Sequence, residues 1–219
     1  MGDDAERGWR DYNRPLLAVY DRVIIGFVAE AVWRCPPEPL LALYRDHIRV
    51  PHLDVGPGTG YVIDRSGLAD GTAVTLVDPN PTVLAYATHR LRRLDVTAVR
   101  ASVLEPLPFD RRFPSAGLNF VLHCLPGPMA RKAAAIRNIA AVLAPGGMLF
   151  GATVLGLGGD QTRLSRAVLR LFNRRGAFDN LGDTEAGLRT ILEASFENVD
   201  ISVAGAIAIF VATAPRLPA

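Results

Sequence analysis

The sequence predicts an α/β fold with a doubly wound, mostly parallel sheet. Short β-branched or apolar runs alternate along the chain with segments whose apolar residues recur at helical spacing, as in parallel sheets covered by helices. The first run ends at Val55 and leads directly into Gly56, Gly58 and Gly60, a turn where the backbone can approach a ligand. Such sheets bind ligands outside the carboxyl ends of their strands. The glycine turn is therefore a candidate cofactor site.

Composition favours one soluble globular domain. Hydrophobic residues make up 49% of the 219 positions and charged residues 21%, which argues for a buried core over disorder. The net charge is only +2 and Lys132 is the sole lysine, so we expect no nucleic-acid partner. Cys35 and Cys124 are far apart and lack C-x-x-C spacing, so we expect neither a disulfide scaffold nor a metal site.

The ends of the chain give a prediction of location. The first fourteen residues, MGDDAERGWRDYNR, lack the basic start and apolar centre of a signal peptide. The longest apolar run, Ile201–Thr213, is interrupted by glycine and is shorter than the roughly 20 residues that a membrane helix needs. We therefore expect a cytoplasmic protein without a membrane partner.

The first half of the sheet follows from local patterns. Leu53–Val55 is typical of the end of a buried strand, and Val62–Ala69 predicts a short helix. Thr72–Asp78 is a β-branched run that predicts the second strand. In Thr82–Leu94, apolar residues recur at helical spacing and arginines take the other face, which predicts a helix. Thr97–Ala101 predicts a third strand.

The central strands follow in the same way. Leu118–His123 is apolar enough for a fourth strand in the middle of a parallel sheet. The alanine-rich segment Met129–Leu143 carries one apolar stripe, and the proline and glycines at 145–147 end the predicted helix. Met148–Leu155 predicts the fifth strand.

The last part of the chain predicts a helix and a hairpin. Thr184–Ser195 has the pattern of a helix. Val199–Val203 and Ala206–Thr213 predict two strands joined at Gly205, which favours an antiparallel hairpin.

Two segments stand apart from this alternation within one globular domain. Residues 1–50 include amphipathic stretches such as Leu16–Val32 and are expected to form a helical cap over the ligand edge, with the main domain at 51–219. Residues 156–183 form a glycine-rich insertion that contains a predicted helix near Thr162–Asn173. We interpret this insertion as a lid.

Three motifs occur in the same order as in a known family. The G-x-G-x-G spacing places Tyr61 where the dinucleotide fingerprint G-x-G-x-x-G has its third glycine, which argues against NAD. LDVGPGTG at 53–60, VTLVDPNP at 74–81 and LAPGG at 143–147 resemble motifs of the class I S-adenosylmethionine-dependent methyltransferases. The resemblance implies a seven-stranded sheet with an antiparallel C-terminal strand, and S-adenosylmethionine as cofactor.

The resemblance also implies the cofactor-binding residues. The glycine loop would let the backbone approach the amino acid tail of the cofactor, and Asp54 would orient that tail directly or through water. Asp78, at the end of the second strand, would accept the ribose hydroxyls. Many relatives carry an aspartate for the adenine amino group where this chain has Ser102, so we expect a weaker bond there, shared by Val103 or Glu105. The complete predicted set is Asp54, Gly56, Gly58, Gly60, Asp78, Pro79, Asn80, Ser102 and Val103, with Pro79 and Asn80 beside the adenine.

Candidates for catalysis and substrate binding lie outside these motifs. His123 is the best-placed base if a proton must leave the acceptor, and the alternative is a core histidine bonded to backbone. The candidates for substrate binding are Tyr12, Tyr20, Trp33, Asn173 and Phe178, although aromatic side chains of the leading segment equally suit packing against the sheet.

The sequence therefore predicts a small-molecule methyltransferase that acts on oxygen or nitrogen, as a monomer or homodimer. Oxygen is preferred because His123 could activate a hydroxyl group. The alternatives are a protein that binds the cofactor without transferring its methyl group, as a scaffold or cyclisation catalyst, and, less favoured, a nucleic-acid methyltransferase or a nicotinamide-dependent reductase.

Overall fold

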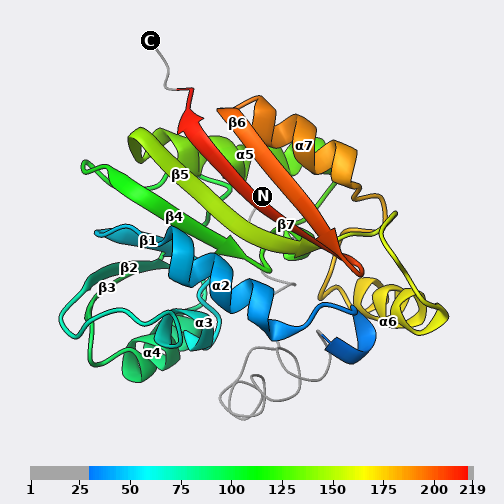
Figure 1. The fold of residues 1–219 in the computed structure, drawn as a ribbon, viewed down its shortest axis with the longest axis horizontal. Coiled ribbons are helices and arrows are strands. Elements are labelled where there is room, and N and C mark those ends of the chain that lie inside the picture. Colours follow the sequence, from blue (N-terminus) through cyan, green and yellow to red (C-terminus); the bar gives the residue numbers. More distant parts are fainter. Residues whose placement is uncertain (1–29, 217–219) are drawn as a thin grey trace.

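A computed structural model describes residues 30–216 of the chain. Its centre is a seven-stranded sheet with the strand order β3-β2-β1-β4-β5-β7-β6 (Figure 1). Strand β7 runs antiparallel to both of its neighbours, and the other pairings along the sheet are parallel. The strands are β1 His52–Val55, β2 Ala73–Val77, β3 Asp95–Val99, β4 Phe113–Asn119, β5 Leu143–Val154, β6 Phe196–Ala204 and β7 Ile207–Pro215. The predicted fold class is confirmed.

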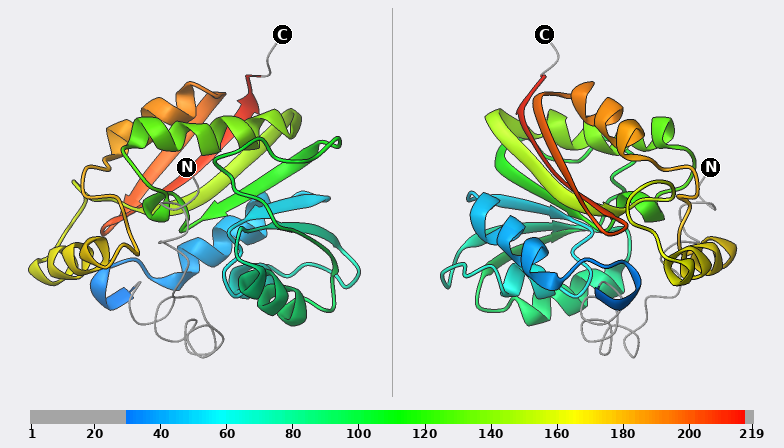
Figure 2. Two further views of the ribbon diagram at one scale, coloured as in Figure 1. Left: turned by 180° about the vertical axis from the view of Figure 1, so that it is seen from behind. Right: turned by 45° about the vertical axis from the view of Figure 1, so that its right-hand side comes forward.

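Helices cover both faces of this sheet. Helices α2 (Pro37–His47), α3 (Tyr61–Asp64) and α4 (Pro81–Arg90) pack against one face, where their apolar residues share a core with β2 and β5. Helices α5 (Met129–Ala141) and α7 (Glu185–Glu193) pack against the other face and come forward when the molecule is seen from behind (Figure 2). Strand β5 lies between the two layers of helices. It is buried from Met148 to Val154, as expected for a strand covered on both sides.

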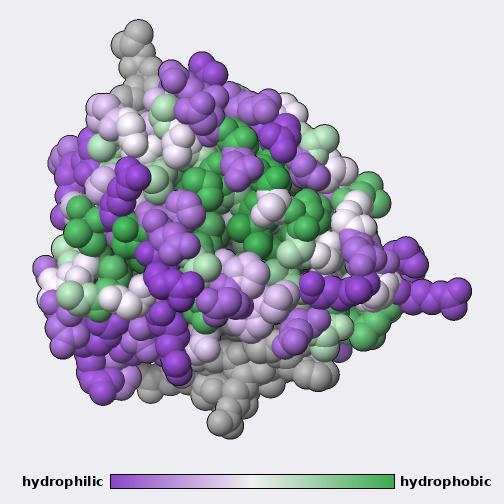
Figure 3. Space-filling view, in the orientation of Figure 1, coloured by the Kyte–Doolittle hydropathy of each residue, from purple (hydrophilic) through white to green (hydrophobic). Residues whose placement is uncertain are grey.

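Helix α6 (Arg163–Arg174) lies beside the end of the sheet (Figures 1 and 2). Thr162 caps it, since its side chain accepts a hydrogen bond from Ser165 N at 3.0 Å. Hydrophilic side chains project from this part of the surface, whereas apolar ones gather over β5, β7 and β6 (Figure 3). Helix α6 therefore presents much of its polar face to solvent.

The segment at 156–183 is held to the rest of the fold at several points. Within the segment, Gly156 N and Leu157 N both donate to Asp183 O at 2.9 Å, which closes its two ends. Asn180 Nδ2 donates to Val154 O of β5 at 2.8 Å. Lys132 in α5 is fully buried and donates to Asp183 Oδ2 at 2.6 Å. The predicted lid role of this segment stays a prediction.

The boundaries of the fourth strand were wrong in the sequence prediction. The strand runs from Phe113 to Asn119, not from Leu118 to His123, and it ends where Phe120 takes a left-handed conformation with φ 59°. His123 lies beyond it in a short 3-10 helix, η2 (Leu122–Cys124). The predicted first helix shrinks to the single turn of α3, and the predicted second helix ends at Arg90.

The N-terminal cap is described only in part. Helix α2, which belongs to the segment predicted as a cap, contacts strand β5 of the sheet and helix α3. Most of Leu16–Val32 falls outside the described residues. Among residues 30–216, no helix combines the length and the apolar character needed to cross a membrane.

Candidate functional site

The glycine loop occupies the carboxyl end of β1, at the centre of the sheet. Gly56, Gly58 and Gly60 have φ of 68°, 54° and 75°, in the region that favours glycine. Gly56 N donates to Val77 O at 2.8 Å, which ties the loop to the end of β2. A Cβ at Gly56 would overlap Val121 Cγ2, whereas a Cβ at Gly58 would meet no described atom within 4 Å. Gly58 therefore faces open space in the part of the chain that the structure describes.

Asp78 follows β2 beside this loop. Its Oδ1 accepts a hydrogen bond from Asn80 N at 2.7 Å, and no described residue bonds its other carboxylate oxygen. Burial raises the pKa of Asp78 to about 7, against the lowering effect of the bond from Asn80. The carboxylate is thus available to a ligand and is sensitive to pH near neutrality.

The predicted adenine-side residues lie on neighbouring turns. Asn80 is buried, and its side chain caps α4 by accepting from Thr82 N at 2.9 Å. Pro79 O accepts from Arg100 Nε at 3.2 Å. Ser102 Oγ accepts from Leu104 N at 3.3 Å, and Val103 O accepts from Asn138 Nδ2 at 2.9 Å. Glu105 is exposed. Their contacts to adenine stay predictions.

Asp54 is almost completely buried behind the glycine loop. Its carboxylate lies on the α2 side of β1, close to the Tyr44 hydroxyl, with Oδ2 3.5 Å from His52 Nε2. Burial raises the pKa of Asp54, while His52 and Tyr44 act in the opposite direction. This position favours a role in fixing β1 and its loop, and direct contact with a cofactor tail stays a prediction.

His123 lies beneath the site, with 3% of its surface exposed. Its Nδ1 accepts a hydrogen bond from Val154 N at 3.2 Å, so the ring proton of the neutral imidazole is on Nε2. Burial, with a smaller contribution from Lys132, lowers the pKa of His123 to about 3. The ring is therefore neutral near pH 7, and its basic nitrogen is already engaged. The base role stays a prediction that this geometry does not favour.

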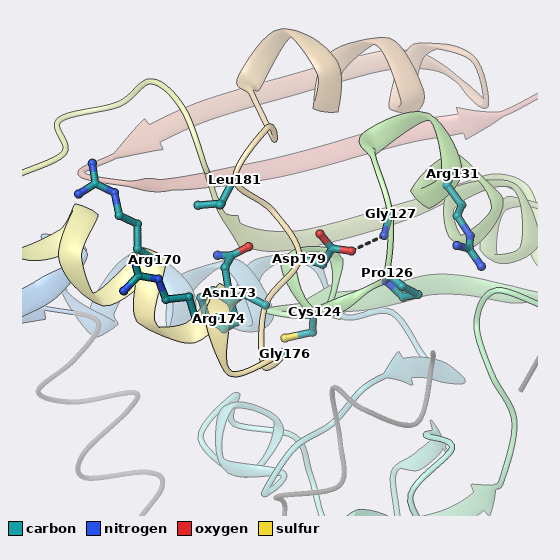
Figure 4. A pocket seen from close by; sticks show the side chains of 11 residues that line it. Cys124, Pro126, Gly127, Arg131, Arg170, Asn173, Arg174, Gly176, Asp179 and Leu181 are labelled. Carbon is teal, nitrogen blue, oxygen red and sulfur yellow. Dashed lines mark hydrogen bonds between the residues drawn. The ribbon is translucent and has the colours of Figure 1, made fainter. Parts of the chain in front are cut away.

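A pocket of about 780 Å³ opens between α6 and the segment after β4 (Figure 4). Phe178 and Asn173, two of the predicted substrate residues, line it. Trp33 is buried behind Phe178, with ring centroids 6.3 Å apart. Tyr12 and Tyr20 lie outside the described residues. The remaining lining residues are Cys124, Pro126, Gly127, Arg131, Arg170, Arg174, Gly176, Asp179 and Leu181.

The pocket and the glycine loop are adjacent along the chain that follows β4. Val121 closes against Gly56 of the loop, and Cys124, one turn later in η2, lines the pocket. The segment after β4 therefore runs from the glycine loop to the pocket. This arrangement suits a donor and an acceptor that react with each other.

Two polar features lie outside the set of residues predicted for the site. Asn119 ends β4, and its Oδ1 is buried without a hydrogen-bond partner among the described residues. Such an atom usually marks a missing ligand or water. The second feature is the cationic lining formed by Arg131, Arg170 and Arg174. In the sequence, Asn119 is marked only by being a polar residue at the end of an apolar strand, in the run LNF at 118–120. A polar residue at the carboxyl end of a strand faces the ligand site.

The residues present fit S-adenosylmethionine. Within the described residues, the loop offers glycine backbone facing open space, Asp78 offers a carboxylate oxygen for a ribose, and Asn119 offers an acceptor without a partner near the carboxyl end of β4. Within residues 30–216 no group of three histidine, cysteine or acidic side chains could hold a metal ion. The fold and the site together define a methyltransferase of the class I, S-adenosylmethionine-dependent type.

Comparison with known proteins agrees with this class. Residues 53–149 match the family model described as a methyltransferase domain. The chain is 38% identical over 206 residues to demethylluteothin O-methyltransferase of Streptomyces thioluteus, covering 93% of this chain and 89% of the relative. It is 36% identical to the physcion biosynthesis cluster O-methyltransferase of Aspergillus chevalieri, covering 97% of each chain.

A solved structure shares the fold at low sequence identity. It is the N-methyltransferase NodS of Bradyrhizobium japonicum in complex with S-adenosyl-l-homocysteine, with a TM-score of 0.59 and 19% identity, covering 82% of this chain and 85% of that one. The chain belongs to the methyltransferase family. The predictions of the enzyme class and of S-adenosylmethionine as cofactor are confirmed.

Proposed function

We propose that this enzyme transfers the methyl group of S-adenosylmethionine to an oxygen atom of a small molecule of specialised metabolism. The observation that carries this proposal is that the segment after β4 links the two sites: Val121 packs against Gly56 of the glycine loop, and Cys124, three residues later, lines the pocket. The names of two of the curated relatives, both O-methyltransferases, support oxygen as the site of transfer, although another relative is named an N-methyltransferase. When bound, S-adenosylmethionine supplies a methyl group on positively charged sulfur.

The chain's own residues divide into a donor side and an acceptor side. On the donor side, the backbone at Gly58 approaches the amino acid tail, Asp78 accepts the ribose hydroxyls, and Asn119 Oδ1 accepts from the ammonium group. The turns at Pro79 and Ser102 would hold the adenine between them. All of these residues lie at the carboxyl edge of the sheet, so this edge is the proposed binding site of the methyl donor.

On the acceptor side, Phe178 supplies an aromatic wall. Its ring packs edge-on against His123, with centroids 4.3 Å apart, and against Phe172 at 5.1 Å. Asn173 Nδ2 donates a hydrogen bond to Asn180 Oδ1, and Asn173 Oδ1 accepts one from Asn180 N. These two bonds fix the loop that carries Phe178. These contacts hold the wall rigid, so we assign His123 a supporting role beneath it.

A small acceptor suits the site better than a nucleic acid. The net charge of +2 provides little attraction for a phosphate backbone. The pocket volume of about 780 Å³ lies in the range of small-molecule sites. We place the enzyme in the cytoplasm as a monomer or homodimer.

Transfer of a radiolabelled methyl group tests this function. The enzyme is incubated with labelled S-adenosylmethionine and three sets of acceptors: hydroxylated aromatic compounds, aromatic amines, and duplex DNA. We expect label in the hydroxylated set, lost in Asp78→Ala and retained in His123→Asn at reduced protein stability. Label only in amines or DNA would contradict the proposal, and cofactor binding without transfer to any set would favour a binding protein.

A further inference from the structure

The acceptor pocket carries an excess of positive charge. Arg131 of α5 stands at one end, and Arg170 and Arg174 of α6, one helical turn apart, stand at the other (Figure 4). No described carboxylate lies within ion-pair distance of these three guanidinium groups. The pocket lining contains one carboxylate, Asp179, so the local charge favours an anionic ligand.

That carboxylate is already committed within the protein. Asp179 Oδ2 accepts a hydrogen bond from Gly127 N at 2.7 Å, and its backbone carbonyl accepts from Lys132 Nζ at 2.7 Å. These bonds join the loop after α6 to the start of α5 across the pocket. Asp179 therefore serves to hold the wall together and is not a free proton acceptor.

The middle of the pocket is apolar. Cys124, Pro126, Phe178 and Leu181 lie between the arginines, and Leu181 is 49% exposed. Arginine side chains at both ends of an apolar surface fit a flat ring system that carries negative charge. A neutral aliphatic ligand would leave this charge unused.

None of the described lining residues is suited to act as a base. Burial raises the pKa of Cys124 to about 12, so its thiol stays protonated. His123 does not line the pocket, and its Nδ1 accepts from Val154 N. Asp179 is engaged as described above. Among the described residues that line the pocket, a neutral alcohol would therefore find no group to remove its proton.

From these observations we infer that the methyl acceptor is an acidic hydroxyl compound, a phenol or enol, bound as its oxyanion between Arg131 and the pair Arg170 and Arg174. The inference rests on the proposed function and names its substrate class. Methylation of an oxyanion forms one oxygen–carbon bond while the sulfur–carbon bond of the donor breaks. The electron pair of that bond stays on sulfur, and the hydroxyl proton of the acceptor has passed to solvent water before the transfer. The positive charges of donor and pocket both stabilise the anion.

A matched pair of anionic and neutral probes tests the inference. Naphthoate and its uncharged isostere naphthamide are titrated into the enzyme saturated with S-adenosylhomocysteine. We expect naphthoate to bind at least about fivefold more tightly, as two partly exposed charge pairs allow. The double variant Arg170→Gln with Arg174→Gln should lose this preference. The control double variant Arg163→Gln with Arg166→Gln removes the same charge from α6 outside the pocket lining and should retain it.

The failures are distinguishable. Equal affinity for both probes, no naphthoate binding at millimolar concentration, or equal loss in the two double variants would overturn the inference while leaving cofactor binding intact. Failure of S-adenosylhomocysteine itself to bind would overturn the proposed function, and the inference with it.

Discussion

The imidazole of His52 and the carboxylate of Asp54 face each other in the core, with Nε2 and Oδ2 3.5 Å apart. Neither atom has a hydrogen-bond partner of normal geometry among the described residues. Ser115 Oγ donates to Arg49 O at 2.7 Å and accepts from Arg49 N at 2.8 Å, so its proton is committed. His52 Nδ1, 2.8 Å from the same oxygen, must therefore be the donor.

This assignment leaves one proton to be placed between the two residues. If His52 were neutral and Asp54 ionised, a nitrogen lone pair would face a buried carboxylate, which is unfavourable. Burial raises the pKa of Asp54, and a proton on its carboxyl group removes the conflict. The carboxyl group of Asp54, directly behind the glycine loop, is thus the group whose raised pKa favours this proton.

The two buried histidines should differ in their tautomers. His52 Nδ1 donates to Ser115, whereas His123 Nδ1 accepts from Val154 N. We therefore expect imidazole nitrogen NMR at neutral pH to show a proton on Nδ1 of His52 and a bare Nδ1 in His123. The variant His123→Asn identifies the signals. A bare Nδ1 in His52 would refute the proton assignment.

Removal of the His52 ring should destabilise the fold. In His52→Phe the ring volume and the stacking on Phe150 are retained, but Ser115 and Asp54 lose their partner. We expect the free energy of unfolding to fall by about 2 kcal/mol in urea denaturation, the cost of unsatisfied buried polar groups. His89→Phe, at an exposed position of α4, serves as control and should change it by less than about 0.5 kcal/mol. Equal effects of the two variants would contradict this account of the buried pair.

Ligand binding through Asp78 should depend on pH. The ionised carboxylate accepts ribose hydroxyl groups, and its pKa is raised to about 7, so affinity is full above this pH and is lost as pH falls through it. Between about pH 8 and about pH 6 the ionised fraction falls about tenfold, and the Kd of the ligand should rise by up to that factor.

Methylthioadenosine is the suitable probe, because it keeps the ribose and adenine but has no amino group that titrates. Asp78→Asn should bind it weakly at every pH. A flat pH profile for the natural sequence would show that Asp78 does not hold the ribose.

The buried ion pair of Lys132 and Asp183 should stabilise the segment that carries the acceptor pocket. Lys132 Nζ donates to Asp183 Oδ2 at 2.6 Å and to Asp179 O at 2.7 Å. Lys132→Met leaves a buried carboxylate unpaired, and we expect a loss of about 3 kcal/mol in the free energy of unfolding. The double variant Lys132→Met with Asp183→Leu should recover part of this loss. Additive losses would show that the two side chains are not coupled.

Much of the sheet could be predicted because its signals are local. Strand β2 and the buried part of β5 are continuous apolar runs. Gly205, a glycine with positive φ, marks the turn of the hairpin. Strand β4 was misplaced because Pro114 and Gly117 are typical of loops. The reason for Gly117 is tertiary: a Cβ there would lie 2.5 Å from Asp54 Oδ2 and 2.9 Å from the Tyr44 hydroxyl. No local pattern contains that contact.

The residues of the donor side were likewise easier to predict from the sequence than those of the acceptor side. The glycines and Asp78 stand next to the strands that position them, so motif and geometry coincide. Arg131 and Arg170 line the same pocket only because α6 packs beside the segment after β4. The clearest mark of Asn119 is its buried Oδ1, which has no hydrogen-bond partner among the described residues.

Titration of S-adenosylhomocysteine into two glycine variants tests the central claim most directly. Gly58 and Gly71 both have positive φ, 54° and 75°, and a Cβ at either would meet no described atom within 4 Å. Alanine should therefore cost each position a similar stability, about 1 kcal/mol. We expect micromolar one-to-one binding by the natural sequence and by Gly71→Ala, and at least about tenfold weaker binding by Gly58→Ala, where the new methyl group occupies the cofactor's space. Equal affinity of the two variants, or no binding by the natural sequence, would contradict the account.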